Sequence, residues 1–205
     1  MQTMKVISTK EIAGSKWLSF KEATYIDKTG AQQKWQYIER QKDNKVVTIV
    51  CKAKGSTKHL FISQPRVPVN KVCISFPAGL VDAGESPEIA ALRELKEETG
   101  YGGTVLSTST LMPKSAGLTT ESEVFVYCEV DPAAAGETKM EQSEDIQHFW
   151  LTPAAFMKMV ATMDQKTTAV ESNCWTYMAG LTGWGSKSKK KYREVMDPSI
   201  SDGIN

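Results

Sequence analysis

The sequence predicts an α/β fold, an α/β/α sandwich with a mixed sheet that is preceded by an N-terminal β-hairpin region. Three observations support this prediction. Short β-rich runs occur on both sides of a helical pattern near residue 90, two more helical patterns follow the last β-rich run, and the sequence contains no internal repeat. A chain of 205 residues can bury one core of ordinary domain size and still carry extensions.

The β-rich runs are recognised by alternation, apolar content and flanking turn residues. Residues 17–27 alternate apolar and polar side chains, the stretch 27–30 reads Asp-Lys-Thr-Gly and indicates a turn, and residues 34–41 return as a second strand. Further strands are expected at 46–53, 59–63, 71–76, 104–112, 123–130 and 146–151, with a loop at 131–144. The run 46–53 is almost continuously apolar, so it is expected at the centre of the sheet.

Three helices are expected, at residues 87–99, 153–163 and 168–181, the second of them capped by Thr152. The first has the clearest end signals. Ser86 suits the N-cap, Pro87 the first helical position, and Gly100 the left-handed residue that follows the last turn. Helical spacing of apolar residues predicts a buried face formed by Ile89, Leu92 and Leu95.

Domain boundaries are expected near residues 45 and 185. They separate an N-terminal β region (1–45), a main domain (46–185) and a basic and polar tail (186–205). Lys and Arg number 25 against 24 Asp and Glu, a balance that argues against a nucleic-acid partner held by charge. No apolar run approaches transmembrane length and the N-terminus lacks a signal-peptide core, so no membrane partner and a cytoplasmic location, with the nucleus as alternative, are expected. The four scattered cysteines are expected to be buried thiols.

The most specific pattern of the sequence lies between residues 79 and 101. Gly79 is followed after five residues by Glu85 and, after seven more, by the run 93–101, which reads Arg-Glu-Leu-Lys-Glu-Glu-Thr-Gly-Tyr. Within it, Glu97 and Glu98 follow Glu94 after three and four residues, so the three carboxylates can line one side of a helix.

Carboxylates crowded in this way repel one another, and a bound cation removes that penalty. Hard divalent ions such as Mg²⁺ take oxygen ligands from a few carboxylates, water and substrate phosphates. The alternative reading of an acidic pair is a solvated helix face. The fixed distances from Gly79, Glu85 and Arg93 favour the metal site instead.

With every position of the pattern filled, this stretch resembles the box of the Nudix hydrolase family. The resemblance implies that Glu94, Glu97, Glu98 and the carbonyl of Ala78 hold Mg²⁺, or alternatively Mn²⁺. It also implies that Arg93 orients a box carboxylate, Glu97 above all. Under the same resemblance Glu85 is a supporting carboxylate, and Gly79 permits close backbone approach.

A second resemblance covers roughly residues 14–181 and is carried by the runs 76–87 and 90–95. It is to the ADP-sugar diphosphatase, or ADP-ribose pyrophosphatase, group of that family. In this group two N-terminal tryptophans clamp the adenine, and a purine stacked on an aromatic ring gains about 1–3 kcal/mol. The substrate-binding residues that it implies here are Trp17, Trp35, Gln36, Arg40, Arg66, Gly79, Leu80, Gly117, Leu118 and Glu121.

The resemblance also extends to an acidic loop at residues 140–146. A glutamate of this loop activates the attacking water in the group. The register leaves either Glu141 or Glu144 for this role, and Glu144 is preferred. One departure is the turn Ser115-Ala116-Gly117, where the group often has proline in the middle, and this puts strict ADP-ribose selectivity in doubt.

The implied activity is Mg²⁺-dependent hydrolysis of the pyrophosphate of ADP-ribose or a related ADP-sugar to AMP and a sugar phosphate. The catalytic residues would be Arg93, Glu97, Glu98 and Glu144 or Glu141. Alternatives are a broader nucleoside-diphosphate or oxidised-nucleotide diphosphatase, and a Nudix module that binds ADP-ribose without cleaving it. In the resembling enzymes the N-terminal hairpin crosses to a second subunit, which implies a homodimer.

Overall fold

The computed structural model describes residues 4–40, 45–140 and 145–184. Within them the chain forms a three-stranded N-terminal sheet and a larger, nine-stranded mixed sheet. The small sheet consists of β1 (Lys5–Gly14), β2 (Leu18–Ile26) and β3 (Gln32–Arg40), all antiparallel. The predicted hairpin is therefore confirmed as β2–β3. Strand β1 was not predicted from the sequence.

The nine-stranded sheet has the order β12-β6-β5-β4-β10-β8, with β11 beside β5, β7 beside β4 and β9 beside β10. Strands β4 and β10 run parallel, as do β6 and β12, while the other pairs are antiparallel. The strands are β4 (Lys45–Ala53), β5 (His59–Arg66), β6 (Lys71–Ser75), β7 (Ala78–Leu80), β8 (Tyr101–Thr108), β9 (Met112–Pro113), β10 (Ser122–Ala135), β11 (Gln147–Leu151) and β12 (Thr168–Val170).

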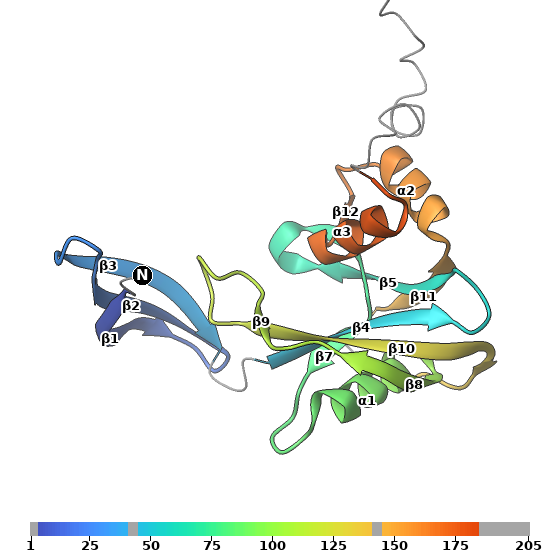
Figure 1. Ribbon diagram of the computed structural model, residues 1–205, viewed down its shortest axis with the longest axis horizontal. Coiled ribbons are helices and arrows are strands. Elements are labelled where there is room, and N and C mark those ends of the chain that lie inside the picture. The colour runs from blue at the N-terminus through green and yellow to red at the C-terminus, as the bar shows by residue number, and fades with distance from the viewer. Residues whose placement is uncertain (1–3, 41–44, 141–144, 185–205) are drawn as a thin grey trace, which may run out of the picture.

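Three α-helices cover the two faces of this sheet (Figure 1). Helix α1 (Pro87–Thr99) lies on one face, and α2 (Pro153–Thr162) and α3 (Ser172–Leu181) lie on the other; a short 3-10 turn, η1 (Val67–Val69), follows β5. The predicted α/β/α sandwich with a mixed sheet is thus confirmed. None of the described helices is long and apolar enough to span a membrane.

Each face of the sheet has its own hydrophobic core. The α1 core contains Val47, Ile49 and Leu95 together with inward side chains of β10. The opposite core packs Phe61, Phe76 and Phe156 between the sheet and the helices α2 and α3, with successive ring centroids 4.7–5.3 Å apart. Strand β4 contributes to both cores, which confirms its predicted central position. All four cysteines are buried free thiols, as expected.

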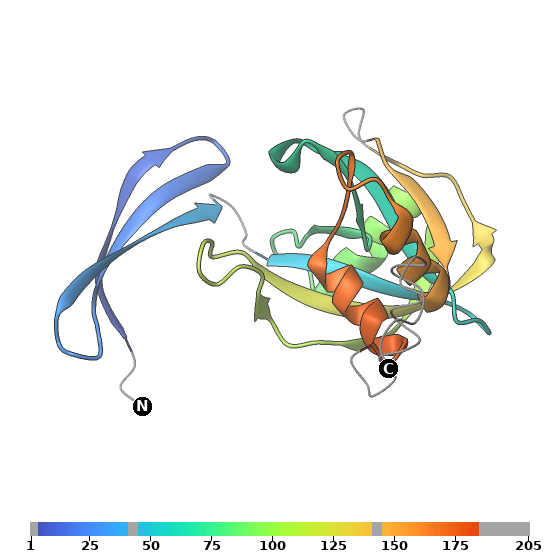
Figure 2. The ribbon, with the colours of Figure 1, turned by 90° about the horizontal axis from the view of Figure 1, so that it is seen from above.

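The N-terminal sheet stands beside the main sheet and is joined to it through the loop 114–121 (Figures 1 and 2). The backbone N–H of Ile38, on β3, donates to the carbonyl of Leu118 at 2.9 Å, and the N–H of Thr120 donates back to the carbonyl of Ile38 at 3.1 Å. Two further contacts of β3 side chains with this loop are described with the site below. Backbone pairing of this kind sets the position of β3 relative to the main sheet.

Three sequence predictions about the elements are wrong in part. The helix expected at 168–181 begins at Ser172, because residues 168–170 instead pair with β6 as strand β12. The strand expected at 104–112 runs earlier, from Tyr101 to Thr108. Strand β10 continues through residue 135 into the expected loop, because it pairs again with the start of β8. Residues 186–205, expected to be a tail, lie outside the described residues.

Candidate active site

Helix α1 presents the acidic side chains of the motif. Its ends match the sequence signals: the Ser86 hydroxyl accepts from the N–H of Ile89 at 3.3 Å, Pro87 is the first helical residue, and Gly100 is left-handed with φ 75°. Glu98 faces inward and is 5% exposed, whereas the side chain of Glu97 is 40% exposed. The predicted buried face is confirmed at Leu95, which is buried, and Leu92 is partly buried; it is wrong at Ile89, which is exposed, whereas Ala90 and Ala91 are buried.

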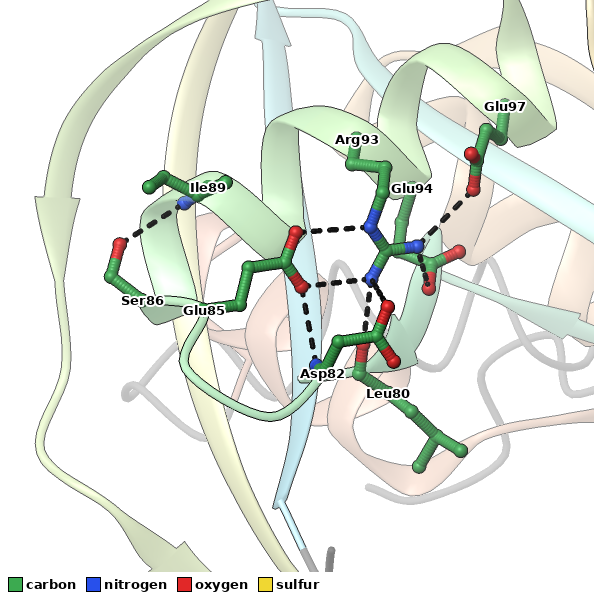
Figure 3. Close-up of polar contacts among 8 residues, drawn as sticks. All are labelled: Leu80, Asp82, Glu85, Ser86, Ile89, Arg93, Glu94 and Glu97. Carbon is green, nitrogen blue, oxygen red and sulfur yellow. Dashed lines mark hydrogen bonds and ion pairs between the residues drawn. The ribbon is translucent and has the colours of Figure 1, made fainter.

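Arg93 connects the acidic side chains to one another (Figure 3). Its Nη1 donates to Glu94 at 2.8 Å and to Glu97 at 3.2 Å, while Nη2 donates to the carbonyl of Leu80 at 3.0 Å. Glu97 is the partner that the sequence suggested for Arg93. The structure adds Glu85, whose two oxygens each accept one bond from Arg93 at 3.0 Å.

The pair of Arg93 and Glu85 fastens the loop before α1 to the middle of that helix. A bidentate bond between a guanidinium and a carboxylate fixes both groups in orientation. The hydrogen bonds from Arg93 lower the pKa of the Glu85 carboxyl, and they raise the pKa of Arg93 itself. Oε2 of Glu85 also accepts from the N–H of Asp82 at 3.2 Å, so the same carboxylate is bonded to the backbone of the loop and to Arg93.

Strand β7 brings the backbone close to these side chains. The N–H of Ala78 donates to Glu98 at 3.2 Å, which turns the buried carboxylate toward β7. A Cβ placed on Gly79 would lie 1.9 Å from Cδ of Glu94, so only glycine leaves room for that carboxylate where it now lies. The geometry therefore gathers Ala78, Gly79, Glu94 and Glu98 at one point between β7 and α1.

Comparison with known proteins identifies the family. The NUDIX domain matches residues 42–170. The chain belongs to the Nudix hydrolase family. It is 31% identical to an ADP-ribose pyrophosphatase of Saccharomyces cerevisiae over 84% of this chain and 80% of that protein, and 33% identical to an ADP-sugar pyrophosphatase of Mus musculus over 65% of each. A crystal structure of an ADP compounds hydrolase shares the fold, with a TM-score of 0.70 at 18% identity over 91% of this chain and 97% of that one.

The donors around this Nudix helix suit a hard divalent ion. Carboxylates and backbone carbonyls are the oxygen ligands that Mg²⁺ and Mn²⁺ take in proteins. In the described part of the chain, no three acidic, histidine or cysteine side chains converge as a metal-binding group. Arg93 bonds to one oxygen of Glu94 and one oxygen of Glu97, and because a carboxylate has about four acceptor positions, these bonds orient the two groups without excluding an ion. Glu141 and Glu144 lie outside the described residues.

The two tryptophans predicted to clamp adenine lie apart on the N-terminal sheet. Trp17, in the turn before β2, is 63% exposed, and Trp35, on β3, is 49% exposed. Leu18, next to Trp17, pairs with Arg40, whereas Trp35 pairs with Ala23. From Leu18 to Ala23 the strand advances about 17 Å at roughly 3.3 Å per residue. Rings that sandwich a purine lie roughly 7 Å apart, twice a van der Waals contact, so this sheet does not bring the two together.

Trp35 and its neighbours on β3 contact either the loop 114–121 or strand β2. The indole N–H of Trp35 donates to the carbonyl of Gly117 at 3.1 Å, and Nε of Arg40 donates to Glu121 at 3.2 Å. The amide of Gln36 instead donates to Glu22 of β2 at 3.3 Å. Four predicted substrate residues thus form two pairs between β3 and this loop, Trp35 with Gly117 and Arg40 with Glu121.

Three other predicted substrate residues are exposed at separate places. Leu118 is exposed in the loop 114–121, and Leu80 is exposed at the end of β7. Arg66 is exposed at the end of β5, where its backbone pairs with Lys71. The structure joins none of these three side chains to another predicted substrate residue through a hydrogen bond among the described residues, although the carbonyl of Leu80 is bonded to Arg93.

Sequence reasoning missed three polar residues beside this group: Thr48, Lys114 and Glu123. Glu123 is a buried acid on β10 that accepts from the hydroxyl of Thr48 at 3.0 Å, with Nζ of Lys114 at 3.9 Å. One signal was available in the sequence. Glu123 precedes the apolar run of β10 and shares the parity of Phe125 and Tyr127, whose side chains pack against the α2–α3 core.

Proposed function

We propose that this Nudix protein hydrolyses the pyrophosphate of ADP-ribose or related ADP-sugars, releasing AMP and a sugar phosphate in a Mg²⁺-dependent reaction, with Mn²⁺ as an alternative ion. One observation carries the proposal: Glu94, Glu97 and Glu98 lie on one helix around Arg93 and against the backbone of Ala78 and Gly79. The substrate class is supported by the names of the yeast and mouse relatives.

The metal-binding residues of this proposal are Glu94, Glu97, Glu98 and the carbonyl of Ala78. Divalent ions held there would offset the negative charge that grows on the leaving phosphate. The chain's own contribution is to hold these oxygens in place: Arg93 fixes Glu94 and Glu97, and the N–H of Ala78 fixes Glu98. Glu144 or Glu141 would take a proton from the attacking water as general base.

The nucleotide end of the substrate is assigned to the N-terminal sheet and the loop 114–121. Exposed indole faces at Trp17 and Trp35 are suited to stack on a purine. Strand β3 also supplies Gln36 and Arg40, and the loop 114–121 supplies Gly117, Leu118 and Glu121. Arg40 and Arg66 can donate to phosphate oxygens. Gly79 and Leu80 would line the diphosphate between that region and α1.

Assembly and location complete the proposal. A homodimer with two-fold symmetry would bring a tryptophan of each chain to one adenine. The protein would act in the cytoplasm, with the nucleus as alternative. It would act on a small nucleotide-sugar without a nucleic-acid or membrane partner. The chain would be divided near residues 45 and 185 into a clamp and dimer region, the hydrolase domain and a tail.

The test is release of AMP from a panel of nucleotide diphosphates in Mg²⁺, with Glu98→Gln as the inactive variant. A glutamine still accepts the hydrogen bond from Ala78 but removes the ligand charge, so turnover should fall by orders of magnitude while adenine binding survives. The matched control is Glu88→Gln, a carboxylate in the first turn of the same helix and outside the motif. Normal turnover of Glu98→Gln would contradict the metal assignment.

The panel also separates the alternatives. Preferred cleavage of oxidised nucleoside triphosphates over ADP-sugars would favour the broader diphosphatase. Binding of ADP-ribose without AMP release in either metal would indicate a binding module.

A further inference from the structure

A recessed carboxylate lies beside the candidate site and takes no part in the reaction as described so far. It belongs to Glu123, whose side chain is 10% exposed, so it is recessed but not sealed from solvent. One oxygen, Oε2, accepts from the Thr48 hydroxyl at 3.0 Å and lies 3.9 Å from Nζ of Lys114. Among the described residues the other oxygen receives no hydrogen bond, although a carboxylate offers about four acceptor positions in all.

Strand pairing places Glu123 on the same sheet face as Leu80, one of the residues assigned to substrate. Glu123 pairs with Val46, and Val46 pairs with Leu80, so the three form one row across β10, β4 and β7. Residues directly opposite one another share a face and adjacent strands are about 4.8 Å apart, so Glu123 is roughly 10 Å from Leu80 in the backbone.

Thr48 connects this row to the metal-binding residues. It pairs with Ala78, whose N–H donates to Glu98. Gly79, one residue further, points the other way, toward Glu94 of α1. The carboxylates of α1 and the carboxylate of Glu123 therefore approach β7 from opposite faces of the sheet, about two strands apart.

Charged side chains link Glu123 to the N-terminal sheet. Nζ of Lys114 lies 3.8 Å from Glu121, and the other oxygen of Glu121 accepts from Nε of Arg40 at 3.2 Å. Helix α3 packs on the same face of the sheet, where Cys174 belongs to the core that Phe125 and Tyr127 of β10 flank. Burial raises the pKa of the Cys174 thiol, and the negative charges of Glu171 and Glu123 raise it further. Lys114 and Glu121 thus separate Glu123 from Arg40 of β3, while Glu123 lies two strands from the diphosphate end assigned to β7.

Hydroxyl groups of a sugar are the ligand that suits this position. A carboxylate held by a hydroxyl and an ammonium keeps acceptor positions free, and a polyol supplies donors for them. Bonds to a charged acceptor discriminate strongly, because a substrate that lacks the donor leaves the recessed charge unpaired. A second anionic group at the same place would be repelled.

We propose that Glu123, seated on Thr48 beside Lys114, is a specificity-determining residue that accepts hydrogen bonds from hydroxyls of the non-nucleotide half of the substrate. The enzyme thereby selects diphosphates whose second half is a sugar or another polyol. This inference rests on the proposed hydrolase function and names a residue that recognises the non-nucleotide half of the substrate.

The experiment compares Glu123→Gln with wild type on two substrates, ADP-ribose and ADP methyl ester, in which a methyl group replaces the sugar. Gln can keep its oxygen on Thr48 and Lys114, which turns its amide N–H₂ toward the ligand and removes the acceptor. The kcat/KM for ADP-ribose should fall about 10–100-fold, the range for a lost bond to a charged group. The value for ADP methyl ester should change by less than about threefold, since it has no sugar hydroxyl to lose.

A control variant and a second test variant complete the experiment. Glu129→Gln, on the same strand and of the same parity as Glu123, should leave both substrates unchanged. Thr48→Val removes the hydroxyl that seats Glu123 and should lower the ADP-ribose value in the same direction, which keeps the test decisive if Glu123→Gln does not fold.

Equal losses on both substrates would show a merely structural role and overturn the inference. Unchanged kinetics on both would overturn it as well. If wild type cleaves ADP methyl ester and ADP-ribose equally well, the enzyme does not recognise the non-nucleotide half of its substrate. The inference then fails while the hydrolase function stands. Release of AMP from neither substrate by wild type would overturn the hydrolase function first, and the inference with it.

Discussion

Gly79 is the residue at which the backbone and the acidic cluster meet most closely. A methyl group there would overlap Cδ of Glu94, the far end of a flexible side chain, so Gly79→Ala would push that carboxylate aside and leave the strand in place. Loss of a positioned group next to a metal ligand typically lowers affinity or activity by 10–100-fold, and we expect AMP release to fall by about that factor. The half-saturating Mn²⁺ concentration should rise in parallel.

The control for this prediction is Gly102→Ala, because a Cβ on Gly102 meets no atom within 4 Å. Both variants should melt within a few degrees of wild type. A Gly79→Ala protein with unchanged activity and metal response would show that the position of Glu94 seen here is unimportant for catalysis.

For single residues, the sequence predicted the acidic cluster of α1 better than it predicted which side chains are buried. The spacing of Glu94, Glu97 and Glu98 predicted that they share a helix face, and Arg93 does contact two of them. The apolar spacing was misleading at Ile89, which is exposed because the small residues Ala90 and Ala91 face the sheet. Glu123 was missed because its environment is built by Thr48, which is distant in sequence, and by Lys114 of the loop 114–121, whose fold returns it to β10.

Elements were predictable where their signals are local. Helix α1 begins and ends where Ser86, Pro87 and Gly100 indicate, since caps depend only on neighbouring residues. Strand β1 was missed because its residues are exposed, and in the described part of the chain it is a strand through its pairing with β2. Residues 168–170 became strand β12 because β6 offers an edge, a long-range fact that no local pattern contains.

The turn between β2 and β3 depends on Asp27 and gives a pH-dependent prediction. Its carboxylate accepts from the N–H and hydroxyl of Thr29 at 2.8 and 2.6 Å and from the N–H of Ala31 at 3.1 Å. These bonds, those from Thr29 first, lower the pKa of Asp27 from 3.8 to about 2. Because the folded pKa is depressed, the contribution to stability is complete above the unfolded value and is lost as the pH falls toward 2.

Asp27→Asn should therefore destabilise the β2–β3 hairpin near neutral pH, and the difference from wild type should shrink as the pH falls from 4 to 2. Amide hydrogen exchange of residues 24–34, measured for both proteins at each pH, would report this locally. A difference that stayed constant down to pH 2 would mean that the ionised form of Asp27 is not what closes the turn. Lys28→Gln, in the same turn, should show no such pH dependence.

For the whole molecule, the sequence order of strands and helices was sufficient to predict a mixed sheet between two helical layers, because each amphipathic helix must cover a face of the sheet. The placement of the N-terminal sheet was not predictable in the same way. It depends on the pairing of Ile38 with the loop 114–121, which lies about eighty residues away in the chain. The consequence is a pair of exposed tryptophans that one chain holds apart.

That separation argues for a dimer. Besides Trp17 and Trp35, the small sheet exposes Val6, Ile7 and Ile12, and apolar residues gathered on one small sheet favour burial against a partner. A two-fold partner would bring Trp17 of one chain to Trp35 of the other, so we expect a dimer by multi-angle light scattering at micromolar concentration. Mixing equal amounts of inactive Trp17→Ala and inactive Trp35→Ala should then restore adenine binding at about a quarter of all sites after random subunit exchange, because about half of the dimers are mixed and each mixed dimer has one site with both tryptophans intact. A monomer that binds ADP-ribose with both tryptophans protected from quenching would contradict the shared site.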